Sequence, residues 1–286
     1  MANLRIGTCS WKYDSWRNLL YSQNENINYL QEYSQKYNTV EIDQWFWSLH
    51  DIDKVTLPAK HVVEEYAASV PDDFTFSIKV PNSITLTHFY NRTKSAPLRE
   101  NPYFLSAELF EKFIESLQPL KSKLGPLMFQ FEYLNKQKMS SQKTFQDRFS
   151  EFAKNIPKGY TYAIEIRNPN YLNAPYFYFL NDNNLRHVFL QGYYMPAITN
   201  VFLNFASSIK NETVLRLHGP DRKGIEKKTG RKWDQIVENR DDEILAIVRM
   251  IQQLLDKDIS VYVNVNNHYE GSAPLTIERI QSRISQ

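Results

Sequence analysis

Eight short segments rich in β-forming residues recur along the chain, and sequence with helical periodicity separates each from the next. These segments are Leu4–Thr8, Thr39–Asp43, Phe74–Val80, Gly125–Phe131, Tyr160–Arg167, Leu185–Gln191, Thr213–His218 and Ser260–Asn266. Their starts lie about 37 residues apart on average, which is the length of a strand–helix unit. Eight strands that alternate with helices predict a parallel sheet closed into a (β/α)8 TIM-type barrel. The alternative is an open doubly wound sheet, but no glycine-rich phosphate-binding loop follows the first strand.

One barrel of this kind accounts for the whole length. The chain has 286 residues, and no linker or low-complexity tract divides it. We therefore expect a single barrel domain over residues 1–286, with long loops after the third and seventh strands. The formal net charge is +2, so the overall charge does not draw the protein to nucleic acid or to a membrane.

The cysteine content and the apolar stretches indicate a cellular location. The single cysteine, Cys9, cannot form an internal disulfide bond, which is typical of a reducing compartment. Strand-like sequence begins at Leu4 and leaves no room for a signal peptide. The longest uncharged stretch, residues 187–209, is interrupted by Gln191 and Pro196, which argues against a membrane span. We expect a cytoplasmic protein without a membrane partner, and the sequence does not indicate its oligomeric state.

Polar and apolar residues alternate within these strands, unlike the continuous apolar runs of most parallel sheets. In the second strand, Val40 and Ile42 would face the helices, while Glu41 and Asp43 would point into the barrel. The other residues expected to face inward are Ser77, Lys79, Gln130, Glu165, Arg167, Arg216, His218, Tyr262, Asn264 and Asn266. Most of them fall near the C-terminal end of a strand, where TIM barrels carry their active sites. The alternation therefore predicts a polar interior with a charged pocket at that end.

Motifs at these strand ends resemble one family. The opening Ile6-Gly7-Thr8-Cys9-Ser10-Trp11, followed by Trp16-Arg17, is similar to the IGTSGW…W opening of the YecE-like proteins, which share domain of unknown function 72. Further similar motifs lie at residues 38–42, 76–81, 124–130, 163–167, 216–219 and 266–268. Cys9-Ser10 departs from the usual Ser-Gly pair, which affects the pocket rim more than the fold. The resemblance implies a TIM-type barrel and brings no reaction with it, so the chemistry is argued from the residues.

The inward-facing charges near the strand ends balance one another. The carboxylates are Glu41, Asp43 and Glu165, and the cations are Lys79, Arg167 and Arg216. We interpret them as a catalytic and substrate-binding set in which Glu165 or Glu41 is the general base and the cations stabilise developing negative charge. Asp43, Gln130, Asn266 and Trp11 would contact or position the substrate. The alternative is a structural ion-pair network, although burying charges costs more than an apolar filling.

His218 lies on the same strand face as Arg216. We interpret it as a catalytic proton shuttle or a metal ligand, and the alternative is a histidine hydrogen-bonded inside the polar lumen. Glu41, Glu165 and His218 together offer oxygen and imidazole ligands for a divalent metal. The sequence contains no HxH or HExxH motif, and the cations already supply positive charge. We therefore expect no required cofactor and keep a divalent metal as the alternative.

Two features are expected at the mouth of the barrel. The tryptophans, which follow the first, second and seventh strands, would form a stacking wall for a sugar or nucleobase, or pack long loops onto the barrel. They are Trp11, which is the best pocket candidate, Trp16, Trp45, Trp47 and Trp233. Residues 220–240 carry seven basic and four acidic side chains, and Gly271 and Ser272 precede a helix. This combination predicts an anion site at the helix start, the alternative being a solvated loop of mixed charge.

The sequence thus predicts an enzyme, with hydrolysis as the first guess, that acts on a small anionic or phosphorylated molecule. The alternative is a nucleic-acid-binding or phosphoester-processing barrel that uses the basic rim and the tryptophans. A carbohydrate-active barrel is a further alternative. Retaining glycosidases need two carboxyl groups about 5–5.5 Å apart, and Glu41 and Glu165 lie on strands that are well separated around a barrel.

Overall fold

The computed structural model describes residues 2–90 and 96–284, and over them it has the expected barrel of eight parallel strands. The strands are β1 (Leu4–Thr8), β2 (Thr39–Ile42), β5 (Thr75–Lys79), β6 (Leu124–Phe131), β7 (Tyr162–Ile166), β8 (Arg186–Gly192), β9 (Glu212–Gly219) and β10 (Ser260–Val265). They are hydrogen-bonded in the order β1-β10-β9-β8-β7-β6-β5-β2. All these pairs are parallel, and β1 and β2 meet at a bridge between Cys9 and Glu41.

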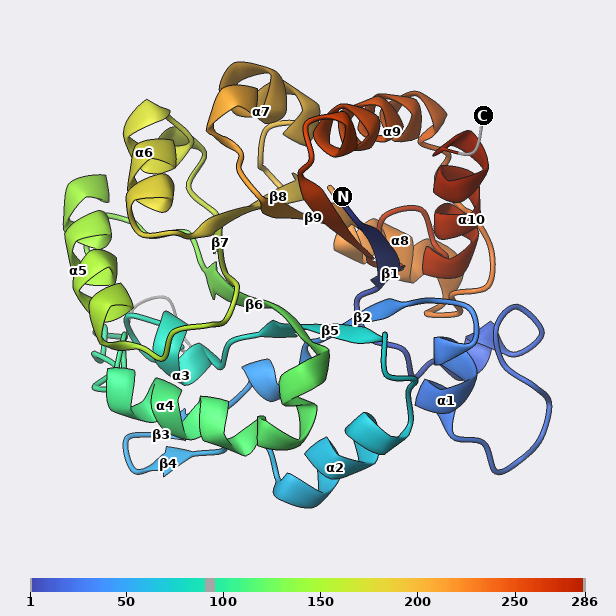
Figure 1. Ribbon diagram of the computed structural model, residues 1–286, viewed down its shortest axis with the longest axis horizontal. Helices are drawn as coiled ribbons and strands as arrows, with labels where there is room; N and C mark the ends of the chain where they lie inside the picture. Colours follow the sequence, from blue (N-terminus) through green and yellow to red (C-terminus); the bar gives the residue numbers. More distant parts are fainter. Residues whose placement is uncertain (1, 91–95, 285–286) are drawn as a thin grey trace.

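One helix of the outer ring follows each barrel strand (Figure 1). These helices are α1 (Tyr29–Ser34), α2 (Lys60–Ala68), α4 (Ala107–Ser116), α5 (Gln142–Asn155), α6 (Ala174–Asp182), α7 (Ile198–Phe205), α9 (Asp241–Asp256) and α10 (Ala273–Ile284). Each buries an apolar face against the strands, as in α5, where Phe149 packs on Phe129 of β6 with ring centroids 5.2 Å apart. The (β/α)8 prediction is confirmed.

A tyrosine closes the seam between β1 and β2. The Tyr33 hydroxyl accepts hydrogen bonds from the Thr8 backbone N–H at 2.8 Å and donates one to the Thr39 carbonyl at 3.0 Å. Gly7 lies against the same carbonyl. A Cβ atom at this position would come within 1.9 Å of the Thr39 oxygen. The close approach of the two strands therefore requires glycine at position 7.

The strand alternation predicted a polar lumen, but the lumen is polar only in part. Its lower part holds an apolar cluster of inward-facing residues: Met128, Ala163, Val188, Val214 and Tyr262. Above this cluster the Asn264 amide donates to the Ser77 hydroxyl at 3.0 Å, and the charged residues follow toward the C-terminal ends of the strands. The apolar layer forms a floor that keeps the charges at one end of the barrel.

Other differences lie in the connections. A hairpin of β3 (Leu49–Asp51) and β4 (Lys54–Val55) and the short helix α3 (Asn82–Thr85) were not predicted, and the strand predicted to end at Asp43 ends at Ile42. The expected loop after β9 contains helix α8 (Arg222–Thr229), and the one after β5 includes residues 91–95, which lie outside the described residues. Among the described residues, no helix is both long enough and apolar enough to span a membrane.

Candidate functional site

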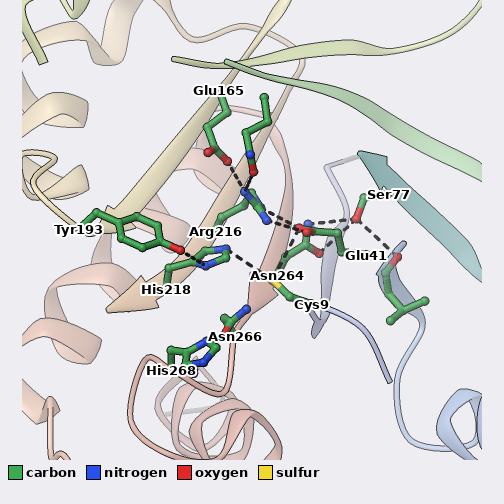
Figure 2. A network of polar contacts seen from close by, with 12 residues as sticks. Cys9, Glu41, Ser77, Glu165, Tyr193, Arg216, His218, Asn264, Asn266 and His268 are labelled. Carbon is green, nitrogen blue, oxygen red and sulfur yellow. Dashed lines mark hydrogen bonds and ion pairs between the residues drawn. The ribbon is translucent and has the colours of Figure 1, made fainter. Parts of the chain in front are cut away.

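Arg216 of β9 lies at the centre of a buried ion-pair network (Figure 2). Its Nε and Nη2 atoms donate to the two carboxylate oxygens of Glu41, on β2, at 2.7 and 2.6 Å. Its Nη1 atom donates to Glu165 of β7 and, at 3.1 Å, to the side-chain oxygen of Gln130 of β6. Arg216 is 2% exposed and both glutamates are fully buried. One guanidinium thus holds together three strands from around the barrel.

This pairing determines the protonation of the network. Burial alone would raise the pKa of Glu165, but Arg216 and Arg167 outweigh it and lower that pKa to about 2. Burial disfavours the charged form of Arg216, yet Glu165 and Glu41 hold its pKa well above the usual value. Glu165 is therefore a carboxylate at any physiological pH and a weak proton acceptor.

Arg167 connects the network to the solvent. Its Nε atom donates to Glu165 at 2.8 Å, and its guanidinium lies over the Tyr193 ring, 4.9 Å from the centroid. The side chain is 21% exposed, and its two terminal nitrogens have no hydrogen-bond partner among the residues that the structure describes. These nitrogens are available to a carboxylate or phosphate oxygen.

Lys79, at the end of β5, is a buried lysine of the site. It is 9% exposed, and its ammonium lies 3.9 Å from the centroid of the Phe46 ring. Within the described part of the chain its amine has neither a hydrogen bond nor an ion pair at contact distance. Burial and the positive charge of Arg216 lower its pKa to about 8, against the opposing effect of Glu41 and Asp43.

His218 and Cys9 lie beside the network, as Figure 2 shows. The His218 Nε2 atom is 3.8 Å from the Cys9 sulfur, and its Nδ1 atom is 3.3 Å from the Tyr193 hydroxyl. Burial and the nearby Arg216 and Arg167 charges lower the pKa of His218 well below its usual value. Burial and Glu41 raise the pKa of Cys9. Both groups are therefore neutral near pH 7.

Asp43 and Asn266 lie at the edge of the site and are half-buried. Burial and the neighbouring Glu41 charge raise the pKa of Asp43. The Asn266 side-chain oxygen accepts a hydrogen bond from the His268 backbone N–H at 2.9 Å, and it also contacts the His268 ring. That ring contacts Glu226 of α8 at 3.1 Å, so Asn266 orients a histidine at the mouth of the barrel.

The structure does not bring Trp11 into this network. Its ring is buried and packs edge-on against Tyr66, with centroids 5.0 Å apart. The tryptophan that is exposed is Trp47, at 62%.

The start of α10 does not offer an open anion site at Gly271 and Ser272. Ser272 is fully buried, and a Cβ atom on Gly271 would meet the Gln235 carbonyl at 2.6 Å. The Ala273 N–H already donates to the Asn267 side chain at 2.9 Å. The buried Glu270 carboxylate also lies at this helix start, where it accepts a hydrogen bond from Thr276 of the first turn. Protein groups thus occupy the position expected for an anion.

A metal bound by Glu41, Glu165 and His218 does not fit the observed geometry. The Arg216 guanidinium occupies the space between the two carboxylates and uses oxygens of both. In the parts of the chain that are described, no three His, Cys, Asp or Glu side chains are arranged to hold a metal ion.

Sequence reasoning missed Cys9 and Tyr193 as parts of the site. Arg5 and Gly7 lie beside the inward-facing Tyr262 and Asn264 in the register of β1 and β10. Cys9 continues this alternation, so extending the first strand by one residue would have assigned it to the lumen. Tyr193 directly follows the last residue of β8, as Asp43, Arg167 and Asn266 directly follow β2, β7 and β10.

Comparisons with known proteins place these features in a family. Residues 5–286 match the model described as "Protein of unknown function DUF72". A DUF72 family protein from Enterococcus faecalis V583 is 21% identical, with 99% of this chain and 96% of that chain covered and a TM-score of 0.68. A DUF72 family protein from Thermotoga maritima MSB8 is 16% identical over 99% of this chain and 100% of that chain, with a TM-score of 0.66. Among curated proteins, none matches this chain.

Proposed function

Because the chain belongs to the DUF72 family, whose description names no activity, we propose a function from the site alone: an enzyme that transfers a proton on a small anionic substrate. The proposal rests on one observation: the amine of Lys79 is buried and has no hydrogen bond or ion pair within the residues that the structure describes. A general acid or base works best when its pKa lies near the operating pH. With a pKa of about 8, about a tenth of the Lys79 side chains would be neutral at pH 7.

In this proposal the ion-pair network is a scaffold. Glu165 binds two arginines and is too weak a base to take the proton, so its role changes from the general base of the sequence analysis to a positioning residue. Glu41 holds Arg216 in the same way. Arg216 is thereby fixed beside Lys79, and the terminal nitrogens of Arg167 would stabilise a developing negative charge on the substrate.

Arg167 is the proposed anchor for the anionic group of the substrate. It is held at Nε by Glu165, while its terminal nitrogens remain available for a bidentate contact. The neutral His218 ring and the Asn266 amide would form hydrogen bonds with the rest of the substrate. Hydrolysis of a phosphate ester is the first reaction to test, because it combines an anionic substrate with a proton transfer. The buried free thiol of Cys9 supports a cytoplasmic location.

The test measures phosphate release from glucose 6-phosphate and adenosine monophosphate by the wild-type chain and by Lys79→Met. Loss of a positioned acid or base lowers the rate about 100-fold or more, and the wild-type pH profile should bend near pH 8. The exposed Lys112→Met variant, on the outer helix α4, is the control and should keep full activity. Unchanged turnover in Lys79→Met would overturn the role of this residue. Binding without turnover by the wild type would make the protein a binding protein instead.

A second candidate is nucleic-acid binding, which a basic cleft beside the mouth favours. This cleft of about 610 Å³ lies between residues 12–18 and residues 231–234. Its lining includes four basic residues, Lys12, Arg17, Arg231 and Lys232, and two acidic ones, Asp14 and Asp234, together with Trp233. If the cleft binds a single-stranded oligonucleotide, Lys12→Gln and Lys232→Gln should each weaken binding and reduce its salt dependence by about one phosphate contact. An affinity that both substitutions leave unchanged would exclude this use of the cleft.

A further inference from the structure

We propose that the ligand of this site carries a ring, and that two pairs of exposed aromatic side chains, on loops at the same end of the barrel as Arg167, bind this ring. The first pair is Trp47 and Tyr90, with ring centroids 5.8 Å apart, and the second is Tyr133 and Tyr194, 6.3 Å apart. We call these four residues the aromatic arc. The inference rests on the proposed function, because it describes the substrate of the same site.

The exposure of these rings is concentrated at one end of the barrel. Among the described residues, five aromatic side chains are exposed, and four of them form the aromatic arc, at 50–62% exposure. The fifth is Tyr178, on the outer helix α6. Large apolar rings are costly to leave in water, so their collection around a polar site indicates that something covers them.

The topology places the aromatic arc around Arg167. Tyr133 follows β6 and Tyr194 follows β8, and these are the two neighbours of β7, whose end carries Arg167. Trp47 and Tyr90 follow β2 and β5, which are next along the sheet. All four rings therefore belong to loops at the end of the barrel that bears the charged network.

The charge of Arg167 acts on one tyrosine of each pair. The part of Tyr90 that is buried and the nearby Glu132 raise the pKa of this half-exposed residue to about 12, and Arg167 opposes the shift. Partial burial also raises the pKa of Tyr194, again against Arg167. The geometry agrees for the second pair, because the Arg167 guanidinium lies over the ring of Tyr193, the residue before Tyr194.

The charges around the aromatic arc limit the kind of ligand. Glu132 is paired with Lys138 at 2.7 Å, and Arg167 is paired with Glu165. Since the local charges are balanced, this surface suits a ligand with one acidic group rather than a polyanion. Exposed rings bind the flat faces of sugars and bases by stacking. The ligand class that fits both features is a cyclic molecule with a single phosphate group, either a sugar phosphate or a nucleoside monophosphate.

The experiment is isothermal titration with five probes: inorganic phosphate, glucose, adenosine, glucose 6-phosphate and adenosine monophosphate. We expect at least one ring phosphate to bind about tenfold more tightly than phosphate alone, because one stacked ring contributes a factor of about this size. The tighter of the two ring phosphates identifies a sugar or a base as the ring. Equal affinity of phosphate and of both ring phosphates would overturn the inference.

Substitutions test whether the aromatic arc supplies the difference. Tyr194→Ala and Trp47→Ala should each weaken binding of the preferred ring phosphate about tenfold and leave phosphate binding unchanged. Tyr178→Ala is the matched control, since it removes an equally exposed tyrosine from the outer surface. An equal effect of Tyr178→Ala and Tyr194→Ala would contradict the inference.

The outcomes also separate this inference from the proposed function. Loss of turnover in Lys79→Met, combined with no effect of the aromatic substitutions, would support the enzyme and reject the aromatic arc. Tight ring-phosphate binding through the aromatic arc without any turnover would support the binding site and reject the enzyme.

Discussion

Replacing Lys79 by methionine should stabilise the protein at neutral pH while it removes activity. Methionine is similar in length and apolar, and it would keep the contact with the Phe46 ring that the ammonium now makes. It would remove a positive charge that is buried beside Arg216 and has no partner among the described residues. A residue kept at a cost to stability is what a catalytic role would require.

The size of the effect follows from the lowered pKa. The fall in the pKa of Lys79 from 10.5 to about 8 corresponds to about 3 kcal/mol by which the fold disfavours the charged amine. This value already includes the attraction of Glu41 and Asp43, which burial and Arg216 outweigh. Between pH 8 and 10.5 the unfolded chain binds more protons than the folded one, so the stability of the wild type rises with pH in this range. The stabilisation by methionine should therefore be full below pH 8 and shrink toward pH 10.5.

The assay compares thermal midpoints of the wild type and Lys79→Met at several values between pH 6.5 and pH 10. For a chain of this size about 3 kcal/mol shifts the midpoint by about 5 °C. Lys112→Met, which changes an exposed lysine, controls for the loss of one charge and should shift it little. A midpoint for Lys79→Met at or below that of the wild type at pH 7, or a difference that stays constant with pH, would refute the reasoning.

Three further predictions concern the seam and the network. Gly7→Ala should lower the thermal midpoint by several degrees, because its Cβ would overlap the Thr39 carbonyl, and an unchanged midpoint would show that β1 can move. Tyr33→Phe should cost about 2 kcal/mol in a urea melt, since it removes the hydrogen bonds that bridge the seam; a loss below about 0.5 kcal/mol would argue that water replaces them. Glu165→Gln should lower stability by about 3 kcal/mol and raise KM through Arg167. It should keep the bend in the pH profile but move it to a somewhat lower pH, because the Glu165 charge helps to raise the pKa of Lys79; loss of the bend would restore Glu165 as the base.

The barrel could be predicted from the sequence because its strands and helices repeat with the right periods. The hairpin at Leu49–Val55 could not, since the preceding Trp45-Phe46-Trp47 run has neither a strand nor a helix period. The apolar floor was missed for a different reason. Met128 and Ala163 occur at inward positions between two apolar neighbours, so they read as part of a continuous apolar run and not as a separate layer.

The alternation in the strands correctly brought Glu41, Glu165 and Arg216 to the lumen, but it could not assign their roles. Parity states which way a side chain points, whereas its chemistry depends on the partner that it meets across the barrel. The long side chain of Arg216 reaches strands on both sides, and it leaves Glu165 a stable anion while Lys79 has no contact partner within the described residues. Lys79, whose pKa lies at about 8, is thus a group with which the network makes no ion pair. A sequence pattern predicts which charged side chains face the lumen. Only the ion pairs in the structure show which of these side chains is available for proton transfer.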